Sequence, residues 1–244
     1  MKKIILVAFI CLVSVLKGYS QDKKVAVVTF YTDKIIDFKQ LGLGSEALLT
    51  EVAGLRDDPN FDLTPILEKF HTEFFSSYAE KLPFILLDEE AVTTNQGYLD
   101  FVPKWEKSED ELKRYVVADG YKFIYEGVLG KENEEGVASV FSDLADGVMF
   151  IEIHFAFEKG FGIGGTSSLK MKAYARMALY DKNGKKVVVI NESANSKKTS
   201  MMVGGIPVMK PEKILPMCES AVEQLMKDLN KRIKKITKNV AKKL

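Results

Sequence analysis

The pair of residues with the clearest potential for chemistry is Glu152 and His154. They are two positions apart, so on a strand both side chains would lie on the same face. A metal site needs three convergent protein ligands, and we can name only two here. Charge pairing with a neighbouring strand, through Lys172 or Tyr174, explains the pair better. A hydrolase or metal enzyme that uses this polar face remains an alternative.

Other patterns that suggest catalysis lack the necessary context. Residues 42–46 (GLGSE) do not have the Gly-x-Ser-x-Gly spacing of a nucleophile elbow. The acidic runs 57–58 and 88–90 lie at the ends of predicted elements, where solvated charge is usual. The glycine run 160–165 precedes a strand, whereas a phosphate-binding loop precedes a helix. We therefore expect no catalytic residue, no metal ligand and no cofactor.

The amino-terminal residues predict export. Two lysines precede an apolar run over residues 4–16, and the small residues Gly18 and Ser20 suit cleavage before Gln21. The run is too short for a membrane span. Cys11 lies inside it without the preceding residues that lipidation requires, so we expect no lipid anchor. The protein is then periplasmic or associated with the outer envelope.

Composition limits the remaining classes of function. We expect residues 1–20 to be a signal peptide and residues 21–244 to form a single α/β envelope domain. Cleavage removes three lysines and leaves 32 basic against 34 acidic residues. This balance argues against nucleic acid as a partner. Only Cys218 remains, so no internal disulfide can form, and its place on an apolar helical stripe predicts a buried thiol.

Three long antiparallel strands organise the carboxyl-terminal half. Apolar and polar residues alternate along 149–157 and again along 169–180, which predicts a sheet with one apolar and one polar face. A hairpin turn at residues 181–185 (DKNGK) leads into a third strand over 187–193. A helix over about 211–240 carries one apolar stripe and is expected to cover the apolar face.

The amino-terminal half adds strands and helices in alternation. The predicted fold class is α/β (α+β), a mixed, mostly antiparallel sheet with helices packed on one face, in the order β-α-β-α-β-β-β-α. Strands are expected over 24–31, 84–87 and 121–129. Helices are expected over 45–52, over 63–82 with Thr64 as its cap, and from the capping box of Ser108 and Glu111 to near Gly120. A charged turn over 131–136 and helical spacing over 137–144 complete this half.

An apolar, methionine-rich segment over 200–216 interrupts this pattern and is predicted to be a loop. Methionine suits adaptable contact surfaces, and an exposed apolar patch marks a partner or ligand site. Alternatively, the loop folds under the last helix and caps the core. The candidate partner contacts are Met201, Met202, Val203, Ile206, Val208 and Met209, together with Phe161 and Ile163 at the glycine-rich hairpin tip.

Three short segments resemble a group of envelope domains. Residues 24–30 (KVAVVTF), 117–127 (VADGYKFIYEG) and 181–184 (DKNG) are similar to segments of the α/β domains related to the amino-terminal domain of TolB. That group includes the penicillin-binding-protein activator LpoB and the curli secretion channel subunit CsgG. The chain departs from it by placing Gly120 after Asp119 and by lacking the lipid-bearing cysteine of several members. The resemblance implies a non-enzymatic domain that binds protein partners.

The predicted function is an exported, non-catalytic binding or assembly module that contacts an unidentified envelope protein. A carrier of a lipid or another apolar ligand is an alternative, in which the ligand would lie between sheet and helices. The basic carboxyl-terminal end could also touch an acidic membrane surface. Its cations are Lys231, Arg232, Lys234, Lys235, Lys238, Lys242 and Lys243.

Overall fold

The computed structural model describes residues 23–41, 54–104, 107–127, 131–204, 206–208 and 211–240. The predicted signal peptide, its cleavage site before Gln21 and the predicted helix over 45–52 lie outside these ranges. The strands are β1 (Lys24–Asp37), β2 (Ile85–Leu86), β3 (Tyr115–Val117), β4 (Gly147–Ile163), β5 (Thr166–Asp181), β6 (Lys186–Val203) and β7 (Ile206–Val208). The α-helices are α3 (Thr64–Glu73), α4 (Glu89–Thr93), α5 (Gln96–Asp100), α6 (Glu109–Leu112), α7 (Glu132–Val140) and α8 (Ile214–Val240).

The fold is built on one mixed sheet with the strand order β2-β1-β4-β5-β6-β7. β3 pairs with residues 31–33 of β1, further along the strand than β2. β1 runs parallel to β2 and β4, and the pairs from β4 to β7 are antiparallel. The predicted α+β class and the antiparallel meander are therefore confirmed. All three meander strands are longer than the alternation predicted, and the turn after β5 has Gly184 at φ 71°.

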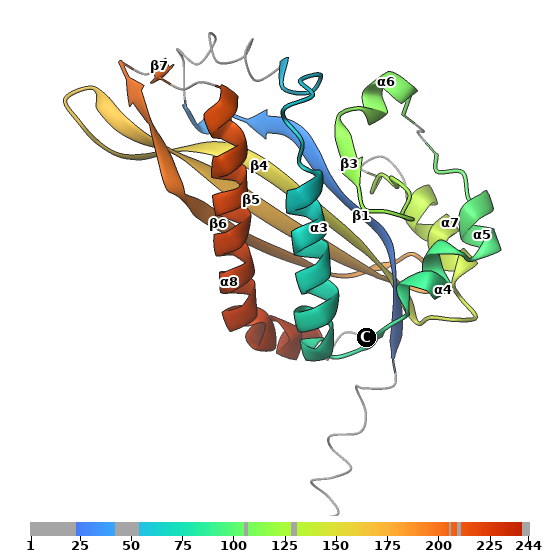
Figure 1. Ribbon diagram of the computed structural model, residues 1–244. Coiled ribbons are helices and arrows are strands. Elements are labelled where there is room, and N and C mark those ends of the chain that lie inside the picture. The colour runs from blue at the N-terminus through green and yellow to red at the C-terminus, as the bar shows by residue number, and fades with distance from the viewer. Residues whose placement is uncertain are drawn as a thin grey trace, which may run out of the picture.

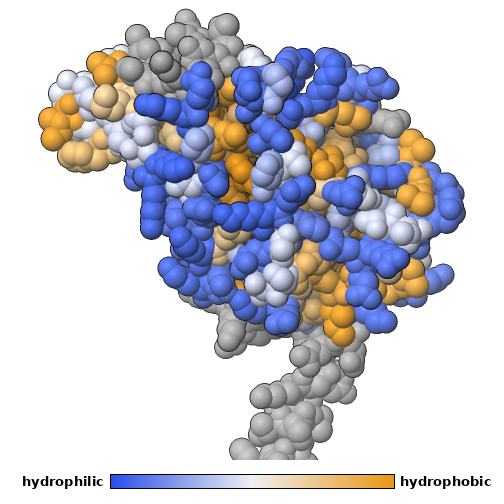
Figure 2. Space-filling model, in the orientation of Figure 1, coloured by the Kyte–Doolittle hydropathy of each residue, from blue (hydrophilic) through white to orange (hydrophobic). Residues whose placement is uncertain are grey.

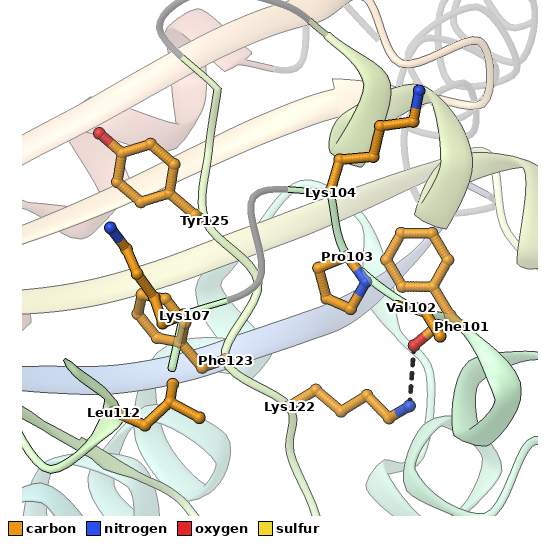
Figure 3. A pocket seen from close by; sticks show the side chains of 9 residues that line it. All are labelled: Phe101, Val102, Pro103, Lys104, Lys107, Leu112, Lys122, Phe123 and Tyr125. Carbon is orange, nitrogen blue, oxygen red and sulfur yellow. Dashed lines mark hydrogen bonds between the residues drawn. The ribbon is translucent and has the colours of Figure 1, made fainter. Parts of the chain in front are cut away.

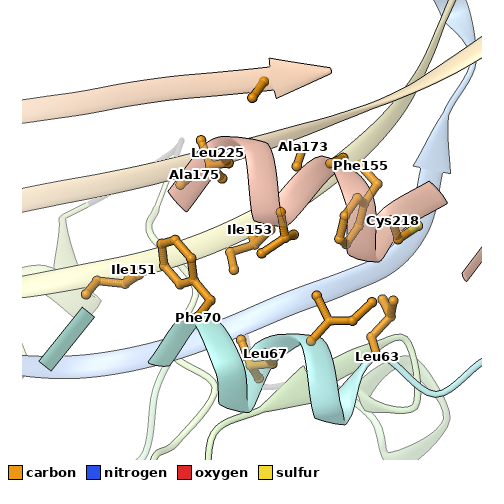
Figure 4. Packing of buried hydrophobic residues seen from close by; sticks show 14 of the residues in the cluster. Leu63, Leu67, Phe70, Ile151, Ile153, Phe155, Ala173, Ala175, Cys218 and Leu225 are labelled. Carbon is orange, nitrogen blue, oxygen red and sulfur yellow. The ribbon is translucent and has the colours of Figure 1, made fainter. Parts of the chain in front are cut away.

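The main core lies between the sheet and the helices α3 and α8, which lie side by side and run in the same direction (Figure 1). The alternation placed Ile153 and Met177 on the apolar face, and they are 1% and 2% exposed. Val222 and Leu229 of α8 lie in the same cluster, as the helical stripe predicted. Figure 4 shows this packing, with Cys218 among the buried side chains. The space between sheet and helices is filled by side chains of the chain itself.

The predicted helix over 63–82 forms with two changes of pitch. α3 ends at Glu73, a π-helical turn covers Phe74–Tyr78, and a 3₁₀ turn covers Ala79–Lys81. Thr64 is not the cap, because it is the first helical residue and its amide donates to Asp62 Oδ1 at 2.9 Å. These changes of pitch keep Phe74 and Tyr78 buried on the face toward α8.

Helices also cover part of the opposite face of the sheet, which was predicted to be polar throughout. α4, α5 and α7 form a second layer there (Figure 1). Phe150 and Tyr180 occupy polar-face positions but are 2% exposed beneath this layer. The hydroxyl of Tyr98 in α5 donates to the Val28 carbonyl of β1 at 2.8 Å. The prediction that helices pack on one face alone is therefore incomplete.

The predicted helix from Ser108 to near Gly120 is wrong after its first turn. The capping box of Ser108 and Glu111 is present, but α6 ends at Leu112. The next residues form β3, which pairs antiparallel with β1. Residues 121–127 were predicted as a strand, yet they form an irregular segment tied to its surroundings by side chains. Thr29 Oγ1, for example, donates to the Lys122 carbonyl at 2.8 Å.

The acidic segments at two helix starts were assigned to turns and loops. α7 already begins at Glu132, within the predicted charged turn, and α4 begins at Glu89 within the acidic run. Carboxylates in the first turn of a helix interact favourably with its dipole, which explains both starts. Within the described ranges, no helix is long and apolar enough to cross a membrane.

Candidate functional site

The projecting end of the sheet is an exposed apolar surface formed by β4, β5 and β6. The β4–β5 hairpin extends beyond the helices, with the end of β6 beside it (Figure 1). The register aligns Ile163, Thr166 and Val203 in one row across these strands. Figure 2 shows apolar side chains gathered at this end, at the upper left. The exposed fractions are 81% for Phe161, 76% for Ile163, 57% for Met201 and 47% for Val203.

Strand alternation explains which residues of the methionine-rich segment reach the surface. Ser200–Val203 belong to β6 and not to a loop, and β7 returns beside them. Met202 lies opposite Ser167 on the helix-covered face and is 2% exposed, so we leave it out of the surface. Met201 and Val203 lie on the other face and are exposed. The prediction of a loop over 200–216 is wrong for the described residues.

The remaining predicted contacts lie at the limit of the described structure. The register of β7 places Ile206 opposite Val203 and Val208 opposite Met201. The side chains of these two β7 residues and the whole of Met209 lie outside the described part of the chain. The surface built from described side chains consists of Phe161, Ile163, Met201 and Val203, and we call it the apolar tip.

Glycine makes the narrow end of the hairpin possible. Gly164 and Gly165 turn the chain at φ 61° and 83°, in the left-handed region that favours glycine. A Cβ at Gly162 would lie 2.4 Å from the Thr166 carbonyl oxygen. The predicted hairpin tip is therefore confirmed. Its two large side chains project from a backbone otherwise made of small residues.

A polar cleft of about 610 Å³ lies on the same face of the sheet, between the apolar tip and the second helical layer. Its centre is Glu152, which the sequence alternation placed with His154 on the polar face. Glu152 accepts from Tyr31 at 2.5 Å and from Arg176 at 2.9 Å, and its other partner is His154 Nε2 at 3.1 Å. Burial opposes ionisation of Glu152, but His154, Tyr31 and Arg176 outweigh it and lower the pKa to about 2.

Two more buried carboxylates complete this polar network. Glu126 is bound by Arg176 and Lys186, and these contacts outweigh the effect of burial and lower the pKa of Glu126. Asp33 is 3% exposed and accepts from Arg114 Nε at 2.8 Å. The carboxylates thus form the floor of the cleft, where each has a cationic partner. This arrangement supports stabilisation through charge pairing.

Sequence reasoning found only part of this network. Tyr174 lies opposite His154, as expected, whereas Lys172 lies opposite Ala156. Arg176 is directly opposite Glu152 and was missed, although it lies on the polar face of β5, two positions after Tyr174. Glu126 and Arg114 come from segments whose conformation was predicted wrongly. The described residues contain no group of three His, Cys, Asp or Glu side chains that could hold a metal ion.

The second histidine, His71, makes contacts that hold elements of the fold together. His71 Nε2 lies 2.6 Å from Glu89 Oε1, and the imidazole packs against Phe30 and Phe75. Tyr121 donates to the same carboxylate oxygen at 3.0 Å. The contacts join α3, α4 and the irregular segment after β3.

A smaller pocket of about 260 Å³ lies beside the polar cleft, on the other side of Tyr125 (Figure 3). Apolar side chains such as Phe101 and Phe123 line it together with three lysines. Lys122 Nζ donates to the Phe101 carbonyl at 2.9 Å, so this cation is already engaged. Lys107 Nζ lies 5.8 Å from the centre of the Tyr125 ring. The pocket borders residues 105–106, which lie outside the described ranges.

Comparisons with known proteins identify no family for this chain. No family model matches it, and no curated protein matches its sequence. Among solved structures, a neuraminyllactose-binding hemagglutinin homolog from Helicobacter pylori is similar at 10% identity, with 92% of each chain covered and a TM-score of 0.38.

Two further solved structures are similar to the chain. A hypothetical protein from Chlamydia trachomatis is 9% identical, with 90% of this chain and 98% of that chain covered and a TM-score of 0.33. A lipoprotein from Neisseria meningitidis is 16% identical, with 84% and 99% covered and a TM-score of 0.25. The resemblance to the TolB-related domains stays a prediction.

Proposed function

We propose that the chain is an exported, non-catalytic binding module of the cell envelope, and that it contacts its partner through the apolar tip. The observation that carries this proposal is the exposure of four large apolar side chains on one end of one sheet. Contiguous exposed apolar surface in a soluble protein marks an interaction site.

Folding alone does not account for these side chains. The buried row on the helix-covered face already ends at Leu169 and Ser167, and Ile163 lies beyond it on the exposed face. Burying a large apolar side chain contributes about 1.5–3 kcal/mol, and Phe161 and Ile163 gain almost none of this within the chain. A polar residue at either position would serve the hairpin equally well. Their apolar character is therefore best explained by a binding partner.

The polar cleft supports a structural role. Its central carboxylate has a pKa of about 2, so Glu152 is ionised at neutral pH and cannot act there as a general acid. Tyr31, His154 and Arg176 already occupy its oxygens. The cleft supports the non-catalytic proposal for this reason.

Site-specific photocrosslinking in the cell envelope tests the contact surface. A photoreactive phenylalanine analogue replaces Phe161 in the full chain, and the matched control replaces Val102, which follows α5 and is 68% exposed. We expect a discrete adduct, with either a protein or a lipid, from position 161 and none from position 102. Equal adducts from both positions, or none from either, would refute the proposal. Thermal unfolding of both variants checks that the fold is retained.

A further inference from the structure

We propose that the apolar tip binds the interface of an anionic lipid bilayer, with Phe161 and Ile163 inserted between the headgroups. This inference rests on the proposed contact surface and assigns it a partner. It also replaces the protein partner expected from the sequence. Three features of the tip support this inference: the lysines around it, their distance from its end and the hydrogen bonds of its backbone.

Beyond Glu158, which lies opposite Lys170, the strand ends around the tip carry only basic charges. Residues 159–170 and 197–204 contain four lysines and no acidic residue, although the whole chain carries nearly equal numbers of both. Lys159 and Lys197 are exposed and make no ion pair with the part of the chain that is described. Lys198 has only a distant partner, Glu219, at 4.0 Å. Apolar residues ahead of a lysine cluster match an anionic membrane surface.

The spacing of these residues matches the layers of a bilayer surface. An antiparallel strand rises about 3.4 Å per residue, so Lys170 lies about 14 Å behind Thr166 at the end of β5. Lys159 is paired with Leu169, about 10 Å behind the same point. Apolar groups of interfacial segments penetrate about 5–10 Å into the headgroup region. Insertion of Ile163 to that depth would bring both lysines to the level of the lipid phosphates.

Much of the backbone at the tip is already hydrogen-bonded within the sheet. Beyond a register shift at residues 160–161, β4 and β5 pair again at Gly162–Ser167 and Ile163–Thr166, and the Gly204 amide donates to the Gly165 carbonyl at 2.9 Å. Backbone groups that are already hydrogen-bonded lose no partner when they leave water, whereas unpaired amides would.

The basic end of α8 is a separate region at the opposite end of the sheet (Figure 1). Of its described cations, Arg232 lies 2.9 Å from Glu192, and Lys231 has only a distant partner, Asp228, at 3.9 Å. A flat membrane cannot contact both ends of the molecule at once. The inference therefore places membrane contact at the tip in place of the carboxyl-terminal end.

Vesicle sedimentation with the full chain, prepared without its predicted signal peptide, tests the inference. We expect binding to vesicles of equal parts phosphatidylglycerol and phosphatidylcholine, and at least about tenfold weaker binding to phosphatidylcholine alone. Phe161→Ser with Ile163→Ser should abolish binding, and Val102→Ser with Leu144→Ser, at exposed apolar positions elsewhere, should leave it unchanged. Lys159→Gln with Lys197→Gln should weaken binding and reduce its salt dependence.

A spectroscopic readout keeps the test valid if the serine variant does not fold. Phe161→Trp keeps an aromatic ring at the tip, and its emission, after subtraction of the wild-type signal, should shift to the blue and be quenched by brominated lipids. No binding to anionic vesicles, combined with a protein adduct from position 161, would overturn this inference and leave the proposed function standing. No vesicle binding and no adduct would overturn both.

Discussion

Removal of the Arg176 guanidinium gives the most direct test of the polar network. Arg176 Nη2 donates to Glu126 Oε1 at 2.7 Å, Nη1 also binds Glu126, and Nη1 donates to Glu152 Oε1 at 2.9 Å. The side chains are only 26%, 12% and 15% exposed for Arg176, Glu126 and Glu152. One cation therefore holds two carboxylates that are largely shielded from water.

Arg176→Met keeps the apolar stem and removes the charge. Breaking a buried ion pair by removing one partner costs about 3–5 kcal/mol. Glu126 retains Lys186 and the Tyr180 hydroxyl, Glu152 retains His154 and the Tyr31 hydroxyl, and Arg176 is partly exposed, so the cost should lie at or just below the lower end of that range. We expect a loss of about 2–3 kcal/mol in the free energy of unfolding at pH 7.

The loss should depend on pH in a defined direction. The folded-state pKa of Glu152, about 2, lies below the ordinary value of 4.5, so its stabilising contribution is present above pH 4.5 and is lost as pH falls toward 2. The pKa of Glu126 is shifted in the same direction. Without Arg176 both values move back toward the ordinary one. The difference in stability between wild type and variant should therefore shrink from pH 7 to pH 3.

Urea denaturation followed by circular dichroism at pH 7, 5 and 3 measures both effects. Lys113→Met is the matched control, because it removes an ion pair with Asp110 in which both side chains are more than 60% exposed. Such surface pairs contribute about 0–1 kcal/mol. An Arg176→Met variant that costs no more than this control, with no change between pH 7 and pH 3, would refute the account of the network.

Three further predictions concern the core and the turns. Tyr98→Phe removes a buried hydroxyl that donates to Val28 and accepts from one backbone amide, and it should cost about 1–2 kcal/mol by urea denaturation. Gly184→Ala places a Cβ 2.6 Å from Glu135 at a φ of 71° and should lower the melting temperature in calorimetry. Cys218 is 0% exposed and burial raises the pKa of its thiol, so a thiol reagent should label it only after unfolding.

The meander could be predicted because its alternation is strict and one of its faces is fully covered. The same alternation also indicated the second helical layer, because two positions on its polar face are not polar. Phe150 and Tyr180 are large apolar residues at polar-face positions, and both are buried by that layer. In β6, Met202 and Ser200 are buried while Met201 and Val203 are not, so the strand pattern continues where glycines and a proline suggested a loop. A period of two was the better guide there.

The segment after Ser108 shows why the rest could not be predicted from local signals. The capping box starts a helix correctly, and nothing nearby in the sequence ends it before Gly120. The helix ends because β1 offers a strand edge, and the aromatic and branched residues of β3 pair with it. That edge is more than 80 residues away in the sequence. Pairing with a strand that is distant in the sequence outweighed the local helix propensity. This pairing also determines where Arg114 and Glu126 lie.

One face of β4 changes its role along the strand, and this change separates the structural from the functional residues. Phe150 is buried beneath the second helical layer, and Glu152 and His154 are held by the polar network. Beyond them Ile163 is 76% exposed, in one row with Thr166 of β5 and Val203 of β6. The first two regions are explained by contacts within the chain, because every side chain named there has a partner. The third region has none among the described residues, so its apolar character calls for a partner outside the chain, and its lysines favour an anionic one.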